Sequence, residues 1–428
     1  MNFNDVEFIQ DLKTMSDRRH EPQWFWEQRQ KALSQISSLS LPEIPQFDFY
    51  DWQLAEVIKP QLHESISSKI SNDKSLNVIV QKGQTTIAID LDQEIKNQGV
   101  IVTDIFTALQ KYPDLIKKYY LNQAIRANED RLTSYHCALM NSGIFIYIPQ
   151  HVKLKQPLMI KIIQDNTFKQ PLIHHLLVVA ASASQVTVIT QLTAQGDQKN
   201  LSNCMVEVIA QTDSKVHFSA IDELPESTMS YLNRRAVIGD RAQVEWSIGM
   251  LNSGPTIADF ASELEGREAQ SNAKVIAIST GSQRAGINTR VTNRGQRTIG
   301  NIVQRGILLE QSQLTFNGIG HIIHGAHGAN AEQENRVLML SDQARGDANP
   351  ILLIDENDVL AGHAASVSQV DEEQMYYLMS RGIDAPTAQR LVIRGFLGPV
   401  IAGMPDNSIQ RQLIDTIERK LINGQKYN

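Results

Sequence analysis

The stretch that decides the fold runs from Asn349 to Gly382 and reads NPILLIDENDVLAGHAASVSQVDEEQMYYLMSRG. Its first half is extended, because the short apolar run Ile351–Ile354 is closed by a group of polar residues. Its second half has a helical period, with Asp371 at the N-cap, Gln374 completing a capping box and Gly382 at the C-cap. The sequence therefore predicts strands before this stretch and helices after it.

Upstream, strand-like runs follow one another at short, fairly regular intervals from Ser142 to about residue 365. Gly, Asn, Ser, Asp and Gln fill the gaps between them and favour turns or solvated positions. The runs include Gly143–Ile148, Val152–Lys155, Pro157–Ile163, Val186–Ile189, Cys204–Ile209, Val244–Ile248, Lys274–Ile278, Gly306–Leu309 and Val337–Leu340.

Three β architectures compete for this pattern. A sandwich or a propeller favours tight hairpin signals between strands of similar length, and Asn317-Gly318 is the one Asn-Gly pair in the region. A parallel β-helix instead joins short strands by turns of irregular length and stacks each coil on the next. The short strands, scattered polar turns and few aromatic residues favour the β-helix.

The N-terminal part of the chain has a different pattern. The first fifty residues are predicted to be helical, with one helix opening after Glu21-Pro22. Two short strands are predicted at Val78–Val80 and Thr86–Ile89, and a further helix over residues 104–127 with a boundary at Pro113. We therefore expect three units: residues 1–135 as an N-terminal helical and α+β unit, residues 136–368 as the β-helix core, and residues 369–428 as a C-terminal helical unit.

Composition limits the functions that the chain can serve. A net charge of -7 at pH 7 argues against nucleic acid as the main partner, since that requires a clustered basic face. The most apolar run, Leu176–Ala181, is far shorter than a membrane span, and Met1–Asp5 is too polar and acidic for a signal peptide. We expect a cytoplasmic protein that binds neither nucleic acid nor a membrane.

The two cysteines, Cys137 and Cys204, lie far apart in the sequence and have no metal or redox spacing. We expect buried thiols in a reducing compartment. The sequence contains no G-x-x-x-x-G-K-[ST] motif, so any ATP hydrolysis must come from a partner.

Two groups of polar residues have alternative interpretations. His321, His324 and His327 form an H-x-x-H-x-x-H series that either converges on a metal in a turn or consists of solvated histidines. Asp355, Glu356 and Asp358 are either a solvated turn or the paired carboxylates of a polysaccharide lyase.

Three segments resemble the SufB/SufD family of iron–sulfur cluster assembly proteins. Asn141–Pro149, followed by Lys155–Leu158, is similar to the family's entry segment into the β-helix. The block Val359–Gly382 resembles its signature more specifically. Glu21–Leu33 resembles the N-terminal helix of the SufD branch, so the likeness extends over nearly the whole chain.

This resemblance implies a right-handed parallel β-helix flanked by an N-terminal unit and a C-terminal helical unit. It also implies a non-catalytic, SufD-like subunit that pairs with a SufB-like chain and a SufC-like ABC-type ATPase to build and transfer iron–sulfur clusters. We expect a homodimer when the chain is alone, no cofactor bound stably by this chain, and a transient cluster at the partner interface. The alternative from a different class is a β-helical carbohydrate-active enzyme.

His363 is the residue that we single out for the chemistry. It lies between small neighbours at the junction of strands and helices, in Ala361-Gly362-His363-Ala364, where the family commonly has Cys-x-His-Gly. Because iron–sulfur sites need thiolates and no cysteine follows Cys204, we expect His363 to share a metal site with a thiolate of the partner.

The C-terminal unit is the expected docking site of the ATPase. After Gly382, apolar residues recur at spacings of three and four, which predicts a helix whose apolar stripe lies on the β-helix or against a partner. The resemblance implies contact with the ATPase, and the residues expected to make it are Leu391, Phe396, Leu397 and Val400.

Overall fold

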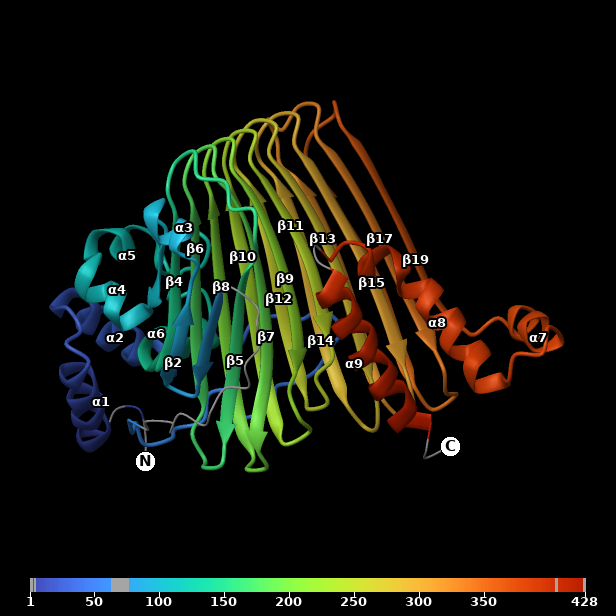
Figure 1. The fold of residues 1–428 in the computed structure, drawn as a ribbon, viewed down its shortest axis with the longest axis horizontal. Helices are drawn as coiled ribbons and strands as arrows, with labels where there is room; N and C mark the ends of the chain where they lie inside the picture. Colours follow the sequence, from blue (N-terminus) through green and yellow to red (C-terminus); the bar gives the residue numbers. More distant parts are fainter. Residues whose placement is uncertain (1–2, 4, 63–76, 405–406, 426–428) are drawn as a thin grey trace.

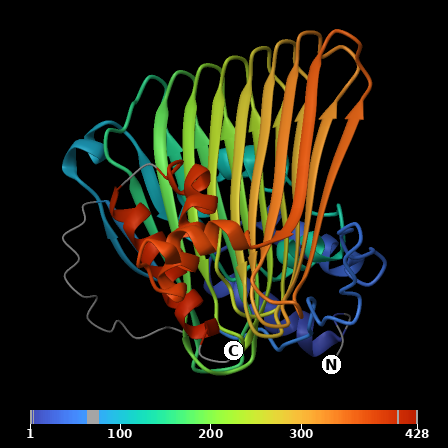
Figure 2. The same cartoon turned by 90° about the vertical axis from the view of Figure 1, so that its right-hand side faces the viewer.

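The computed structural model describes residues 3, 5–62, 77–404 and 407–425. It shows a mainly β protein in which a long parallel β-helix carries an α+β region at its N-terminal end and helices of the C-terminal region on one face (Figures 1 and 2). The predicted fold class is confirmed. Among these residues, no helix is long and apolar enough to cross a membrane.

The N-terminal region alternates helices with short strands. The helices predicted within the first fifty residues and the strands predicted around Gly83 are confirmed, whereas α3, β3 and α6 are not predicted by the sequence. The elements are α1 (Val6–Arg18), α2 (Gln23–Gln35), β1 (Val78–Lys82), β2 (Thr85–Asp90), α3 (Gln93–Asn97), β3 (Ile101–Asp104), α4 (Ile105–Lys111), α5 (Pro113–Tyr119) and α6 (Arg131–Leu139).

The prediction of a helix over residues 104–127 is wrong beyond Tyr119, where α5 ends. Leu121 has a positive φ of 45°. The two carboxylate oxygens of Glu207 accept hydrogen bonds from the backbone N–H groups of Leu121 and Ile125, at 2.7 and 3.0 Å. In a continuing helix, these N–H groups would donate to carbonyl oxygens of the preceding turn. They donate instead to the Glu207 carboxylate, so the helix does not continue beyond α5.

The β-helix consists of sixteen consecutive strands. They are β4 (Ser142–Ile148), β5 (Leu158–Asn166), β6 (Leu172–Ala180), β7 (Gln185–Gly196), β8 (Asn200–Ala210), β9 (Lys215–Glu223), β10 (Thr228–Ile238), β11 (Gln243–Met250), β12 (Thr256–Leu264), β13 (Gln270–Ser279), β14 (Arg284–Asn293), β15 (Ile299–Leu308), β16 (Gln313–Ile322), β17 (Asn330–Met339), β18 (Arg345–Ile354) and β19 (Leu360–Gln369). The run Val152–Lys155, predicted as a strand, forms only the isolated bridge Lys153–Gln185, because it lies in the connection that brings the chain to the opposite sheet.

Successive strands alternate between two sheets. The ten-stranded sheet has the order β19-β17-β15-β13-β11-β9-β7-β5-β1-β2, and the nine-stranded sheet has the order β18-β16-β14-β12-β10-β8-β6-β4-β3. The strands of the β-helix pair in parallel, whereas β2 and β3 pair antiparallel at the N-terminal end. Each coil therefore adds one strand to each sheet.

The register fixes which side chains face the interior, because in-register neighbours of parallel strands lie on the same face of a sheet. One interior column of the ten-stranded sheet runs from Leu158 through Trp246 and Ile302 to Gln333 and His363. Its members from β5 to β15 belong to the apolar core between the sheets. Only its last two positions, on β17 and β19, are polar.

The corners of the β-helix are stacked as regularly as its strands. Asp213, Arg241, Glu268 and Arg297 all have a φ between 55 and 60°, and each donates its backbone N–H to a carbonyl of the next coil. Acid and base alternate along this row, so Arg241 pairs with Asp213 at 2.7 Å and Arg297 pairs with Glu268. Exposed ion pairs contribute little to stability. The backbone hydrogen bonds between successive coils are therefore the main interaction that holds the corners together.

The two outer faces of the β-helix carry different regions of the chain. Helices of the N-terminal region pack on the nine-stranded sheet through an apolar cluster that includes Phe145, Leu177 and Tyr231. The C-terminal elements are α7 (Glu372–Ser380), α8 (Ala385–Ile401) and α9 (Asn407–Gln425). Of these, α8 and α9 pack on the ten-stranded sheet, and α7 projects beyond the last strand (Figure 1).

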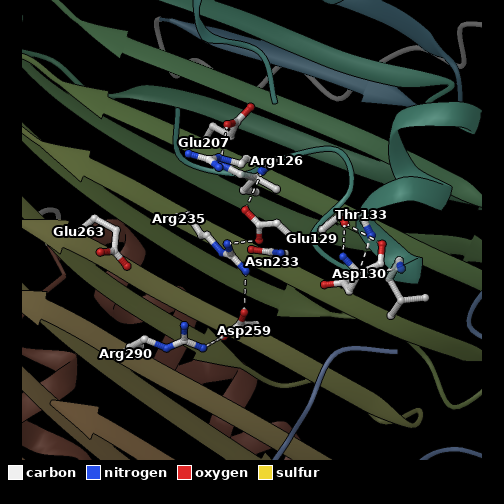
Figure 3. A network of polar contacts seen from close by, with 12 residues as sticks. Arg126, Glu129, Asp130, Thr133, Glu207, Asn233, Arg235, Asp259, Glu263 and Arg290 are labelled. Atoms are coloured by element: carbon white, nitrogen blue, oxygen red, sulfur yellow. Dashed lines mark hydrogen bonds and ion pairs between the residues drawn. The ribbon is translucent and has the colours of Figure 1, made fainter. Parts of the chain in front are cut away.

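Ion pairs also join the N-terminal region to the nine-stranded sheet (Figure 3). Arg235 on β10 bonds both Glu129, which precedes α6, and Asp259 on β12, the second at 3.0 Å. Asp130 caps α6 through a capping box with Thr133. The α6 end of the N-terminal region is therefore held to two successive coils.

Candidate functional site

The C-terminal end of the β-helix is open. β18 and β19 are the outermost strands of their sheets, and among the residues that the structure describes no element pairs with their outer edges. Leu360 is 71% exposed there, and Leu353, Ile354 and Val367 are exposed as well. An open strand edge with exposed apolar side chains is a surface that another chain can cover.

His363 lies on this open coil. It is the last member of the interior column that contains Gln333, and it is exposed because no further coil follows. A groove of about 550 Å³ on the ten-stranded sheet crosses β13, β15 and β17 and ends at Gly362, His363 and Ala364. The structure thus brings the histidine singled out from the sequence to the exposed end of the molecule.

The three histidines of the H-x-x-H-x-x-H series do not converge on one point. His321 lies 3.2 Å from Asp355, while His324 and His327 lie 3.7 and 3.3 Å from Glu356. Within the described part of the chain, no group of three or more histidine, cysteine, aspartate or glutamate side chains is arranged to hold a metal ion. The histidines instead contact the acids of the turn on the neighbouring coil.

The acids Asp355, Glu356 and Asp358 belong to this turn. Glu356 accepts hydrogen bonds from the backbone N–H groups of Gly325 and Asn357, which hold the pKa of its carboxyl below the usual value. Asp358 accepts the N–H of Gly328 through its carbonyl oxygen. The turn interpretation accounts for these contacts without an enzymatic role.

The four residues expected to contact the ATPase separate into two pairs. Leu397 and Val400 are buried in the apolar cluster between α8, α9 and the ten-stranded sheet. Leu391 is 44% exposed, and Phe396 is partly buried with the Arg305 guanidinium 5.6 Å from its ring. In α7 no side chain is buried, and Tyr376 is 76% exposed. Among the described residues, the exposed large apolar side chains of the C-terminal helices lie on α7, at Leu391 of α8 and at Ile422 of α9.

The structure also shows a buried chain of titratable groups that sequence reasoning missed. His175, on the outer face of β6, lies 3.1 Å from Glu207 of β8 and 3.0 Å from His136 of α6. The other ring nitrogen of His136 lies 2.9 Å from Oδ1 of Asn203. The pair His174-His175 is visible in the sequence, but nothing there indicates that only His175 faces the N-terminal region.

Hydrogen-bond accounting fixes the protonation of this chain. Asn203 donates from Nδ2 to the Leu132 carbonyl, so its Oδ1 must accept a proton from His136 Nδ1. Because burial lowers the pKa of both histidines, to about 3 for His175, His136 Nε2 accepts from His175 Nδ1. His175 Nε2 then has no proton, and its contact with Glu207 is a hydrogen bond only if Glu207 is protonated. Burial raises the pKa of Glu207 to about 8, which agrees with this assignment.

Comparison with known proteins identifies the family. Residues 162–396 match the family described as "SUF system FeS cluster assembly, SufBD core domain", and residues 8–160 match "SufBD protein N-terminal region". The chain belongs to the SufBD family and is thus a component of the SUF system of iron–sulfur cluster assembly.

Within this family the resemblance to SufD is specific. The chain is 39% identical to the iron–sulfur cluster assembly protein SufD of Bacillus subtilis, over 96% of this chain and 97% of that protein. It is 25% identical to an iron–sulfur cluster assembly SufBD family protein of Staphylococcus epidermidis, over 91% of this chain and 88% of the relative. The SufD branch expected from the sequence is therefore confirmed, and the comparisons support iron–sulfur cluster assembly over the carbohydrate-active alternative.

The buried chain of titratable groups predicts a pH dependence of stability. The folded state raises the pKa of Glu207 from 4.5 to about 8, so its contribution to stability is lost as pH rises between these values. Glu207→Gln removes this titration. The free energy of unfolding of the wild type, relative to that variant, should therefore fall by up to ~1.4 kcal/mol per pH unit from pH ~6.5 to ~8.

Chemical denaturation across this pH range measures the difference. Glu226→Gln, which removes an exposed carboxylate, serves as the control. The buried histidines His136, His174 and His175 have lowered pKa values, so their titration changes the free energy of unfolding mainly below their ordinary pKa of 6.5. They therefore contribute little to the pH dependence between pH ~6.5 and ~8. Parallel pH profiles for the wild type and Glu207→Gln would contradict the protonated assignment.

Proposed function

We propose that this chain is a SufD-like, non-catalytic subunit of the SUF complex. It pairs with a SufB-like chain and with a SufC-like ABC-type ATPase, and contributes to building and transferring iron–sulfur clusters. The observation that carries the proposal is the open last coil, which places His363 beside two unpaired strand edges. The 39% identity to SufD of Bacillus subtilis supports the same subunit type.

The partner chain joins at β18 and β19. Unpaired backbone groups at a sheet edge gain hydrogen bonds when another strand is added, and the exposed apolar side chains there gain from burial. A SufB-like chain with an equivalent last coil can extend both sheets at once. In the absence of that partner, a second copy of this chain can occupy the same surface, which gives the homodimer.

We expect the double variant Leu360→Lys/Val367→Lys to be monomeric at micromolar concentration, because it places two charges on each copy at the joint. Sedimentation and the hydrogen exchange of β19 amides report the change. Val6→Lys, at an exposed position on α1, should leave the wild-type dimer intact. A wild-type chain that is monomeric, with freely exchanging β19 amides, would refute this joint.

His363 and a partner thiolate form the site at which the nascent cluster is held as substrate. A neutral imidazole is a competent iron ligand, and histidine replaces cysteine at some iron–sulfur sites. This chain offers no thiolate there, since Cys137 and Cys204 are both buried and burial raises the pKa of each thiol to about 12. The sulfur ligand must therefore belong to the partner.

We expect His363→Ala to leave assembly of the complex and ATP hydrolysis unchanged while cluster formation is largely lost. The measurement is iron and sulfide per complex after anaerobic purification, together with ATPase activity. His324→Ala changes an exposed histidine in the turn between β16 and β17, one coil earlier, and serves as the matched control. An unchanged cluster yield in His363→Ala would leave His363 without a role in the chemistry.

The ATPase docks on α7 and the exposed side of α8. These helices present Tyr376, Tyr377, Met379 and Leu391 to solvent, whereas Leu397 and Val400 hold α8 on the ten-stranded sheet. An exposed apolar helix surface fits a groove on a partner. Deletion of residues 385–428 would uncover the apolar face of the sheet, so surface substitutions are the better test.

We expect Tyr377→Ala/Leu391→Asp to lose the ATPase while the free energy of unfolding changes little, because both side chains are exposed. Leu397→Ala should instead cost about 2–5 kcal/mol of stability, since it opens a cavity in the core. Co-purification and chemical denaturation separate the two effects. Tyr50→Ala is the surface control. Retention of the ATPase by the double variant would exclude this surface.

A further inference from the structure

A row of asparagines crosses the outer face of the nine-stranded sheet. Asn288, Asn317 and Asn349 are Cα partners on β14, β16 and β18. The residue before each of them lies in or packs against the apolar core between the sheets, so alternation along the strands turns the asparagines outward. Asn317 donates to Asn288 at 2.9 Å, and Asn349 donates to Asn317 at 3.0 Å. The row is therefore a hydrogen-bonded ladder that ends on the outermost strand of this sheet.

Backbone carbonyls fix the direction of this asparagine ladder. The Nδ2 group of Asn288 donates to the Glu43 carbonyl at 2.9 Å, and that of Asn317 donates to the Pro45 carbonyl at 3.0 Å. A carbonyl oxygen can only accept, so neither amide can be turned round without losing its bond. The Oδ1 atom of each of these two residues consequently accepts from the next asparagine along the row.

Asn349 is the rung at which these bonds run out. Its Nδ2 group donates to Asn317, as the direction of the ladder requires, which leaves its Oδ1 toward the open edge. Among the described residues, no group donates to this Oδ1, and no carbonyl accepts the second N–H as Pro45 does for Asn317. Unlike the unpaired amide atoms inside the β-helix, these atoms are not enclosed by the protein. They are therefore available to a chain that joins the edge.

We propose that Asn349 is a specificity-determining residue of the joint with the SufB-like subunit: its Oδ1 accepts an N–H from a polar side chain on the adjoining strand of that subunit. This inference rests on the proposed function and specifies the chemistry of the partner's edge. An asparagine, glutamine, lysine or arginine side chain in register fits, because each offers an N–H donor. An acidic side chain would place one acceptor against another, and an apolar side chain would leave the Oδ1 unpaired.

The ten-stranded sheet has a second asparagine ladder, which ends differently. Asn301 donates to Asn272 at 2.8 Å, and the same register continues to Glu332 on β17 and Gly362 on β19. Glycine has no side chain, so β19 offers only backbone groups at this position. Of these two ladders, only that of the nine-stranded sheet therefore reaches the joint with a side chain.

The affinity of the full-length chain for the SufB-like subunit tests the assignment. Asn349→Ala removes the acceptor and should raise the dissociation constant about three- to tenfold, the effect of one hydrogen bond. Asn349→Asp keeps an acceptor toward the partner and should bind within about twofold of the wild type, or more tightly. Its second oxygen opposes the Oδ1 of Asn317, so its cost should appear as a lower resistance of the chain to chemical denaturation.

Asn301→Ala is the matched control, because it removes the equivalent bond of the second ladder on a strand that is not at the edge. It should leave the dissociation constant unchanged. A dissociation constant for Asn349→Ala that stays within twofold of the wild type, or that rises no more than in Asn301→Ala, overturns the inference. A weaker complex for Asn349→Asp than for Asn349→Ala would show that the partner presents an acceptor, which overturns it too.

The double variant Leu360→Lys/Val367→Lys separates this inference from the proposed joint. If the double variant loses the SufB-like subunit while Asn349→Ala binds it normally, the joint stands and the role of Asn349 fails. If the double variant binds as the wild type does, the joint lies elsewhere and the inference fails with it. If both variants weaken the complex and Asn301→Ala does not, the asparagine ladder continues into the partner.

Discussion

Parallel, in-register pairing between successive coils is the constraint on which this structure depends. The backbone N–H and C=O groups of a coil are satisfied by the coils on either side, so no coil is complete by itself. At the N-terminal end, antiparallel pairing with β2 and β3 ends the stack. At the other end β18 and β19 have no such neighbour among the described residues. The interaction that builds the β-helix thus also creates the surface on which its function is proposed.

The same register decides the environment of each side chain. Interior columns are apolar over most of the β-helix, because each coil gains stability by burying side chains against the previous one. The column of His363 becomes polar only at Gln333. Polar groups in an interior cost free energy unless they are paired, so a polar end to an otherwise apolar column is a departure that function can explain.

On the two outer faces of the β-helix, tertiary packing gives residues of the same type different environments. On α8, Leu397 and Val400 complete a core with the ten-stranded sheet, while Leu391 points to solvent. On the opposite face, Glu207 and His175 are buried beneath the N-terminal region, where His175 lies 3.1 Å from Glu207 and 3.0 Å from His136. The residue types alone do not distinguish a packed leucine from an exposed leucine, or a surface glutamate from a buried acid.

The sequence by itself determined the local structure and the family. Short valine- and isoleucine-rich runs separated by polar turns indicated a β-helix, and Asp371 and Gly382 marked the ends of α7, because these signals act over a few residues. The block around His363 pointed to the SufB/SufD family for the same reason. Tertiary structure alone decided that α5 ends at Tyr119, which apolar residues of α8 remain exposed, and which polar residues meet across coils. Those outcomes depend on contacts between residues far apart in the chain, such as Glu207 with Leu121, and no local pattern encodes them.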